Sequence, residues 1–174
     1  MSAVRFILRW WAAFALAACL AMLGIAILVF EKGLGYAPCH LCIQQREIYW
    51  ATAAVAALGL VWALLRRPRG TPRLAAVLIL LGFAFETYRA TFHAGVELKW
   101  WHGPATCTGG GGAMDMNAIR NLLNGGAVHE PMCDVAVWHF AGLSMAGWNA
   151  VGAGILTLVS LAAVLRRDGG RRGR

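Results

Sequence analysis

The sequence predicts an all-α membrane protein in which four transmembrane helices form one bundle, with residues 1–174 making a single membrane domain. Of these residues, 59% are hydrophobic and only 14% are charged, so ionic groups cannot cover the surface as they do in a soluble domain. Four stretches are long and apolar enough to cross a hydrocarbon core of roughly 30 Å. The net charge of +8 comes mainly from separated arginine clusters, a pattern that does not indicate nucleic-acid binding.

The four spans follow from the uncharged stretches of the chain. They are expected at about residues 10–30, 47–65, 74–93 and 145–165, since about 20 residues at 1.5 Å per residue cross a bilayer core. The apolar part of the third, Leu74–Phe85, is too short on its own. We therefore extend it to His93, which brings Glu86 and Arg89 into its outer end.

Arginine clusters orient these spans. They lie before the first span, between the second and third, and after the fourth: Arg5 and Arg9; Arg66, Arg67, Arg69 and Arg73; Arg166, Arg167, Arg171, Arg172 and Arg174. Because cytoplasmic loops are enriched in Lys and Arg, both termini are expected to be cytoplasmic. The loops at about 31–46 and 94–144 then face the periplasm or extracellular space, and they hold four of the five cysteines on the oxidising side.

The fifth cysteine, Cys19, follows Leu16-Ala17-Ala18, which looks like a lipoprotein cleavage site. The apolar sequence nevertheless continues to Phe30 without a polar tether. We therefore interpret the segment as a retained span with a buried, inert thiol.

The first cysteine pair stands in Pro38–Arg46, PCHLCIQQR, where the second span begins. A proline followed by helix-compatible residues places Cys39 and Cys42 in the first turns of that helix. On a helix, Cys39, Cys42 and Arg46 fall within an arc of about 60°, so the helix N-terminus and the arginine charge both favour a thiolate. The alternative is an inert disulfide beside an arginine that reaches toward the headgroups. Haem attachment is excluded, because C-x-x-C-H requires histidine where Ile43 stands.

The second pair, Cys107 and Cys133, lies in the second periplasmic loop with 25 residues between the two cysteines. Taken alone, this spacing is typical of a structural staple. The glycines at 109–112 would also let Cys107 enter a partner's active site while Cys133 moves elsewhere, and the first pair favours this interpretation. Near-helical spacing of apolar residues at 114–123 predicts a short helix lying on the membrane. Residues near the ends of the loop are interpreted as interfacial anchors: Trp100, Trp101, Trp138 and His139.

Glu86, Arg89 and His93 share one face of the third span, at a depth similar to that of Cys42 and Arg46. They could line a pocket for a quinone head group, with His93 hydrogen-bonding a carbonyl. Alternatively, Glu86 and Arg89 neutralise each other, and this is the account we favour for those two residues.

These features together resemble the family of disulfide bond formation protein B, DsbB. The resemblance covers nearly the whole chain and rests on the four spans and on short strings: P-C-x-L-C-x-x-Q-R at Pro38–Arg46, the order of the cysteine pairs, Gly95-Val96-Glu97 ahead of Cys107, and Gly142–Met145. It implies a bacterial inner-membrane oxidoreductase that reoxidises a periplasmic, DsbA-like dithiol protein of thioredoxin fold. The two electrons would pass to the membrane quinone pool, ubiquinone or menaquinone. Such a protein supports disulfide formation in exported proteins and is expected to act as a monomer.

Carried over by motif position, the resemblance assigns a role to each cysteine of the two pairs. Cys107 would form the mixed disulfide with the partner, and Cys133 would be released to attack Cys39. Cys42 would become the thiolate that faces the quinone, with Arg46 stabilising it. His93 matches a quinone-contacting histidine of the family by position and type.

Three other readings remain to be tested. Vitamin K epoxide reductase also uses a four-helix bundle with two thiol pairs, but its C-x-x-C follows the loop pair, whereas here the order is reversed. A structural zinc site would use all four periplasmic thiols, Cys39, Cys42, Cys107 and Cys133, in a scaffold protein, and the oxidising compartment argues against it. A small channel using Glu86 and Arg89 would function with every cysteine replaced by serine.

Overall fold

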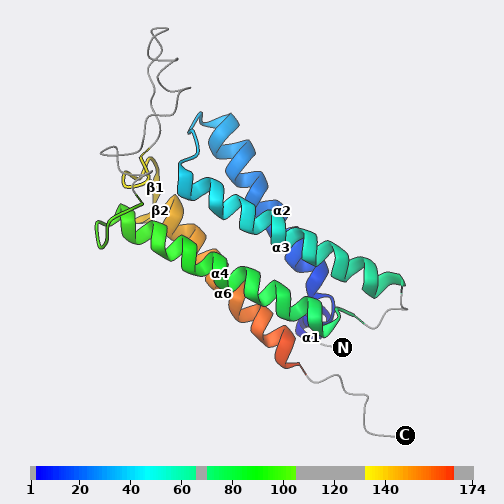
Figure 1. The fold of residues 1–174 in the computed structure, drawn as a ribbon. Coiled ribbons are helices and arrows are strands. Elements are labelled where there is room, and N and C mark those ends of the chain that lie inside the picture. Colours follow the sequence, from blue (N-terminus) through cyan, green and yellow to red (C-terminus); the bar gives the residue numbers. More distant parts are fainter. Residues whose placement is uncertain (1–2, 66–69, 105–131, 167–174) are drawn as a thin grey trace, which may run out of the picture.

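The computed structural model describes residues 3–65, 70–104 and 132–166. The helices run side by side (Figure 1), and in chain order the elements are α1 (Ala3–Arg9), α2 (Trp11–Gly24), a π-helical segment η1 (Ile25–Gly33), α3 (His40–Leu65), α4 (Arg73–Glu97), β1 (His139–Phe140), β2 (Leu143–Ser144) and α6 (Met145–Leu165). The strands β1 and β2 form a two-residue antiparallel hairpin, in which His139 pairs with Ser144. The Ser144 hydroxyl accepts a hydrogen bond from Gly147 N and so caps α6.

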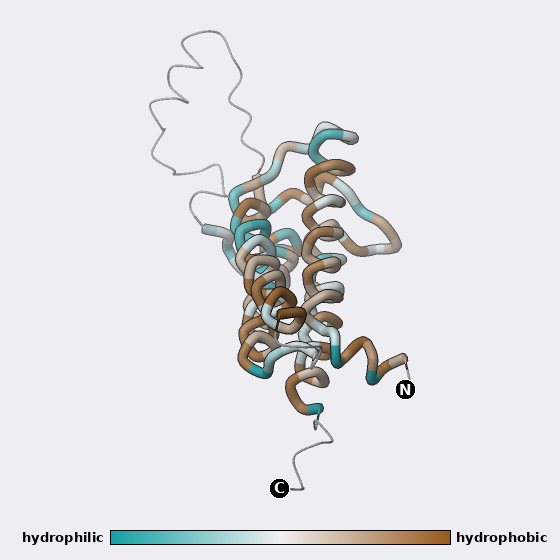
Figure 2. The backbone as a smooth tube through the Cα atoms, turned by 90° about the vertical axis from the view of Figure 1, so that its right-hand side faces the viewer, coloured by the Kyte–Doolittle hydropathy of each residue, from teal (hydrophilic) through white to brown (hydrophobic). Residues whose placement is uncertain are grey.

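Four long apolar helices in this all-α structure are consistent with four transmembrane spans: Trp11–Gly33, His40–Leu65, Arg73–Glu97 and Met145–Leu165. Hydrophobic residues dominate their length (Figure 2). Large apolar side chains point outward, such as Leu58 at 72% and Leu158 at 67% exposure, while Ala56 and Ala153 are fully buried. Small residues inside and large apolar residues outside are the distribution expected of helices packed within lipid.

The helices extend beyond the stretches expected from charge-free sequence. The second begins at His40 rather than near residue 47, and the third continues to Glu97 rather than ending at His93. The added turns contain polar residues that composition places outside a span, and one of them, Gln45, is buried against other helices rather than exposed to water. The fourth helix covers the expected residues 145–165. Cys107 and the short helix expected on the membrane lie outside the described residues.

Close helix contacts depend on small residues at two positions. A Cβ atom added at Gly59 of α3 would lie 2.7 Å from the Cβ of Ala75 in α4, and one added at Gly82 of α4 would collide with the side chain of Thr52 in α3. Van der Waals packing of this kind drives helix association where lipid removes the hydrophobic force between helices. The contact face between α3 and α4 therefore has no room for a larger side chain at either glycine.

The arginine-bearing segments meet at one end of the bundle, where α1 begins and α6 ends (Figure 1). Thr71 N donates to the carbonyl of Arg9 at 2.8 Å, and the guanidinium of Arg166 donates to the carbonyls of Leu8 and Thr71. Gly70 permits this approach, because it has a φ of +86° and a Cβ there would lie 2.6 Å from Arg9. The cysteine motif at the start of α3 lies at the opposite end of that helix.

Replacing Gly82 with leucine is expected to lower the free energy of unfolding by about 1–3 kcal/mol, because the new side chain overpacks the contact with Thr52. The measurement is thermal unfolding of the purified protein in detergent. Gly24→Leu is the matched control, since nothing lies within 4 Å of a Cβ at that position. Equal stability of the two variants would contradict the packing described for α3 and α4.

Candidate functional site

Cys39 and Cys42 lie together at the beginning of α3, as the sequence predicts. Cys39 immediately precedes the helix, and the backbone N–H of Cys42 donates to the Cys39 Sγ at 3.3 Å. The two sulfurs are 2.9 Å apart and both cysteines are free. The structure thus describes the two cysteines as neighbouring thiols whose sulfurs are in direct contact.

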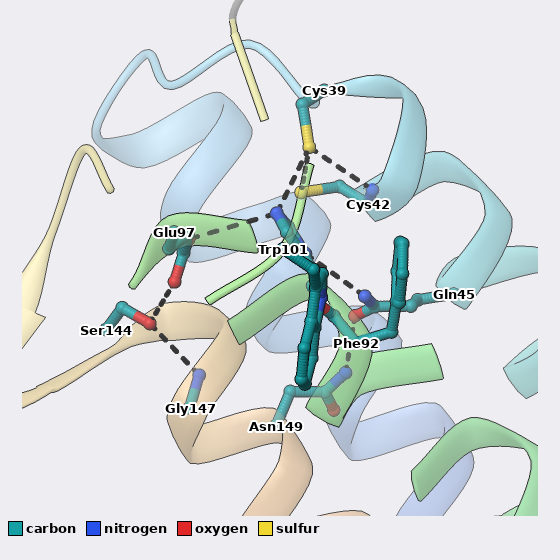
Figure 3. Close-up of polar contacts among 10 residues, drawn as sticks. Cys39, Cys42, Gln45, Phe92, Glu97, Trp101, Ser144, Gly147 and Asn149 are labelled. Carbon is teal, nitrogen blue, oxygen red and sulfur yellow. Dashed lines mark hydrogen bonds and ion pairs between the residues drawn. The ribbon is translucent and has the colours of Figure 1, made fainter. Parts of the chain in front are cut away.

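His93 of α4 reaches this pair from the neighbouring helix. Its Nε2 lies 3.7 Å from the Sγ of Cys39 and 3.8 Å from Oε1 of Glu97. The second carboxylate oxygen of Glu97 accepts a hydrogen bond from the hydroxyl of Ser144 (Figure 3). His93 and Cys39 are both buried, so the imidazole is a fixed neighbour of the sulfur rather than a group at the lipid interface.

A chain of amide hydrogen bonds continues from the other ring nitrogen of His93 into the bundle. Gln45 Nε2 lies 3.1 Å from His93 Nδ1, and Gln45 Oε1 accepts from Asn149 Nδ2 at 2.7 Å (Figure 3). Asn149 Nδ2 also donates to Glu86 Oε1 at 2.8 Å, and Asn149 Oδ1 accepts from the Tyr49 hydroxyl at 2.6 Å. Three helices, α3, α4 and α6, are linked through these side chains.

Arg46 lies one helical turn beyond Cys42 on the same side of α3. Its guanidinium forms an ion pair with Glu31 at 2.6 Å and donates to the carbonyl of Ala26 at 3.4 Å. Both partners belong to the π-helical segment η1. The Arg46 side chain is only 19% exposed, so the ion pair fixes a positive charge beside Cys42 rather than leaving it to extend toward the headgroups.

A cavity of about 380 Å³ opens beside these groups. Its polar edge is formed by Cys42, Gln45, Arg46, Tyr49, His93 and Asn149, and its remaining lining is mainly apolar: Met22, Leu23, Ile25, Ala26, Phe30, Trp138, Met145, Ala146, Trp148 and Gly152. Small-molecule sites typically have this size and combine apolar walls with a few polar groups. The cavity could therefore hold a flat, apolar molecule with polar atoms at one end.

Cys133 joins the first pair from the second loop. It is 2% exposed and belongs to a buried cluster with Cys39, Leu41 and Val96, against which Cys42 is also packed. Cys133 is disulfide-bonded, whereas Cys39 and Cys42 are free. The structure thus places an oxidised cysteine of the loop next to a reduced pair at the helix start.

Comparisons with known proteins identify the family of the chain. The sequence model of "Disulfide bond formation protein DsbB" matches residues 8–163. The chain belongs to the DsbB family. Among curated relatives, the disulfide bond formation protein B of Dechloromonas aromatica is 32% identical over 91% of this chain and 93% of its own length, and that of Paracidovorax citrulli is 31% identical over 90% and 87%. No solved structure matches the chain.

As a DsbB-family member, the protein is a multi-pass membrane thiol oxidoreductase involved in disulfide bond formation. The structure brings Cys39, Cys42, Arg46, His93 and Cys133 to one end of the bundle. Cys19 instead lies in the main apolar core between the helices and is fully buried.

Several residues at this DsbB-family site were missed by sequence reasoning. These are Glu31, which binds Arg46, and Gln45 and Asn149, which carry the amide hydrogen bonds. Glu97 and Trp138 were noted in the sequence without a role at the site, and they lie beside His93 and along the cavity. The Q of the P-C-x-L-C-x-x-Q-R string was the one signal that could have identified Gln45. Glu86 accepts a hydrogen bond from Asn149, and the described residues show no direct ion pair between Glu86 and Arg89, although the charge of Arg89 acts on Glu86. That the two residues neutralise each other stays a prediction.

The surroundings of Cys39 favour its thiolate. Hydrogen bonding from Cys42 contributes most to lowering the pKa of the Cys39 thiol, and the hydrogen bond from His93 lowers it further, against burial, which raises it. The helix N-terminus acts in the same direction. In the dithiol state the negative charge is therefore favoured on Cys39.

We expect alkylation of Cys39 in the reduced protein to persist at acidic pH. A thiol with an ordinary pKa of about 8.5 loses nearly all its thiolate between about pH 8 and about pH 6, so its rate falls roughly a hundredfold. The rate at Cys39, whose pKa is lowered, should change only slightly over the same interval. The measurement is iodoacetamide labelling followed by peptide mass spectrometry, with a model thiol peptide as reference. A rate at Cys39 that falls in parallel with the reference would contradict this electrostatic account.

Proposed function

We propose that the protein reoxidises a periplasmic, DsbA-like dithiol protein and passes the two electrons to a membrane quinone. The observation that supports this most directly is the cavity, because the sulfur of Cys42 and the charge of Arg46 stand at its polar edge. A dithiol at a cavity with apolar walls can deliver electrons to a lipid-soluble acceptor. Family membership supports the thiol chemistry.

The proposed relay moves disulfides inward from the loop. The partner's thiolate attacks the Cys107–Cys133 disulfide and forms a mixed disulfide with Cys107, releasing Cys133. Cys133 then attacks Cys39, opening the Cys39–Cys42 disulfide and leaving Cys42 as a thiolate. The partner's second thiol displaces Cys107, Cys107 returns to Cys133, and Cys39 closes on Cys42 as two electrons leave. In sum, one dithiol becomes one disulfide and one quinone becomes one quinol.

The contacts of Cys133 support the transfer between the two pairs. Disulfide exchange requires a thiolate close to the sulfur that it attacks, and Cys133 is buried in the same cluster as Cys39. A disulfide at Cys133 beside free Cys39 and Cys42 is compatible with the step of this relay at which the α3 pair holds the electron pair. Loss of that electron pair would return the protein to its fully oxidised form.

The residues at the cavity edge fit a quinone head group. A quinone accepts two electrons and two protons when bound, and its carbonyl oxygens require hydrogen-bond donors. Arg46 and the amides of Gln45 and Asn149 offer donors at that edge, and aliphatic and aromatic side chains offer walls for the ring and tail. Arg46 would also stabilise the Cys42 thiolate when Cys39 is bonded to Cys133, because its charge is held in place by Glu31.

We also propose that the end of the bundle with Cys39 and Cys42 lies on the periplasmic side of a bacterial inner membrane. The arginine-rich ends would then be cytoplasmic, in accord with the charge bias of membrane loops. The segments around Arg9, Thr71 and Arg166 are hydrogen-bonded to one another at one end of the bundle. This supports placing all three on the same side of the membrane.

A steady-state assay of dithiol oxidation in proteoliposomes tests the proposal. Under anaerobic conditions, oxidation of a reduced thioredoxin-fold dithiol protein should require both this protein and quinone in the bilayer. The readout is the loss of free thiols on the soluble protein, with vesicles lacking quinone as the control. Equal rates with and without quinone would contradict the assignment of the electron acceptor.

One observation favours a second candidate, a metal-binding role. Cys39 Sγ, Cys42 Sγ and a ring nitrogen of His93 all lie within 4.8 Å of one another, and thiolates with imidazole are typical zinc ligands. Against a four-thiolate site, Cys133 is engaged in a disulfide. Zinc analysis of the purified protein decides: stoichiometric zinc with all thiols reduced would replace the oxidase proposal with a metal scaffold.

A further inference from the structure

Glu86 is the most deeply buried carboxylate at the site, and no sequence motif accounts for it. It is fully buried in α4, it does not line the cavity, and its only hydrogen bond among the described residues comes from Asn149. Its other oxygen, Oε2, has no hydrogen-bond partner in the described part of the chain. A buried carboxyl in a membrane helix is costly and indicates a role.

The hydrogen bonds that leave Glu86 have a defined direction. Asn149 Nδ2 has two hydrogens, and it donates one to Glu86 Oε1 and the other to Gln45 Oε1. Because its carbonyl oxygen is used in this way, Gln45 turns its own NH₂ toward His93 Nδ1. That ring nitrogen must then be an acceptor, so the hydrogen of the neutral imidazole is on Nε2, which faces Cys39.

The direction of this series of hydrogen bonds depends on the acceptor at its Glu86 end. Tyr49 also contacts Asn149, but a hydroxyl can either donate or accept, so it does not by itself fix the amide. Glu86 Oε1 can only accept a hydrogen bond from Asn149. Its other oxygen, Oε2, has no hydrogen-bond partner among the described residues. With a glutamine at position 86, either an oxygen or an NH₂ could face Asn149. Both amides could then turn over, and His93 would carry its hydrogen on Nδ1, leaving Nε2 without a proton for Cys39.

We propose that Glu86 is a positioning residue that sets the direction of the hydrogen-bond chain through Asn149 and Gln45, and so holds His93 in the Nε2–H tautomer that donates to Cys39. Its consequence for electron transfer rests on the function proposed above. Glu86 acts three side chains away from the sulfur and does not itself contact the reacting atoms.

NMR of the protein labelled with ¹⁵N-histidine tests this inference, because the imidazole nitrogen signals distinguish the two neutral tautomers. The His93 signals are assigned by comparison with His93→Gln. Wild type should show His93 as Nε2–H alone. In Glu86→Gln both tautomers should appear in comparable amounts. Single-turnover oxidation of the Cys39–Cys42 dithiol by quinone should then slow by about twofold or more, in proportion to the fraction of molecules that have lost the Nε2–H tautomer. Glu86→Asp, which keeps the carboxylate, should restore mainly Nε2–H.

Thr87→Val provides the matched control. Thr87 is the next residue of α4 and makes a 3.0 Å hydrogen bond to Thr157 of α6, so its replacement removes a polar contact between the same two helices without touching the chain from Glu86. Its His93 signals and its oxidation rate should equal those of wild type. Retention of the Nε2–H tautomer alone in Glu86→Gln would overturn the inference.

A second variant keeps the inference testable if Glu86→Gln fails to fold. Asn149→Leu has a similar volume and cuts the chain between Glu86 and Gln45, so it should also yield both tautomers, and an unchanged tautomer there would equally overturn the inference. The NMR readout needs neither quinone nor partner protein. Absence of quinone reduction in wild type would therefore reject the proposed function, while the tautomer result separately decides the role of Glu86.

Discussion

Replacement of Cys42 with serine is expected to abolish quinone reduction entirely. Without the second sulfur, Cys39 cannot form the disulfide that Cys133 opens, and no thiolate remains at the polar edge of the cavity. A disulfide involving Cys133 can still oxidise one equivalent of partner dithiol. In a single-turnover experiment we therefore expect one partner disulfide per protein and no quinol, measured by thiol titration and by absorbance of the quinone.

Cys19→Ser is the matched control for this variant. It is the same substitution at a buried cysteine of the main core, outside the cluster that contains Cys39 and Cys42. Quinol formation should match that of wild type, apart from effects of folding that are checked by gel filtration in detergent. Quinone reduction by Cys42→Ser at a measurable rate would show that another group delivers the electrons.

Replacement of Arg46 with leucine is expected to lower kcat/KM for quinone roughly 10²-fold, the loss typical of removing one fixed donor from developing negative charge. The guanidinium is the cation at the cavity edge, and Glu31 and the carbonyl of Ala26 hold it in position. Leucine preserves the apolar bulk but removes both the charge and the donors. The measurement is steady-state oxidation of a dithiol partner at varied quinone concentration.

Lys32→Leu separates this local effect from a change in net charge. Lys32 lies beside Glu31 in the η1 segment but is exposed, and its removal changes the charge of the protein by the same amount. Its kcat/KM should remain within about twofold of wild type, as for most exposed charges. Similar losses in both variants would mean that Arg46 acts through the general surface potential and not through the cavity.

Much of the architecture could be predicted from composition alone. Long apolar stretches, the third of them extended past Glu86 and Arg89, predicted four long helices because crossing lipid requires about 20 residues. The fourth helix, Met145–Leu165, has the expected limits. The other helices extend further, because polar residues such as Gln45 are stabilised by partners on other helices. Hydropathy records only each residue's own preference and misses such partners.

The site itself was only partly accessible from sequence. Local spacing predicted that Cys39, Cys42 and Arg46 share one helical face, since 3.6 residues per turn fixes that relation. Glu31 and Asn149 could not be found in this way, because their contacts with Arg46 and Gln45 span 15 and 104 positions along the chain. The π-helical course of residues 25–33 also has no signal in composition, yet it supplies both the carbonyl and the carboxylate that hold Arg46.

The most direct test of the proposed function is a count of electrons in one anaerobic mixing experiment. Wild-type protein loaded with one equivalent of quinone is mixed with a reduced thioredoxin-fold dithiol, and quinone reduction is followed by absorbance while free thiols are counted. We predict one quinol for each partner disulfide formed. Partner oxidation without quinol, or no oxidation together with stoichiometric bound zinc, would contradict the relay from the loop cysteines through Cys39 and Cys42 to quinone.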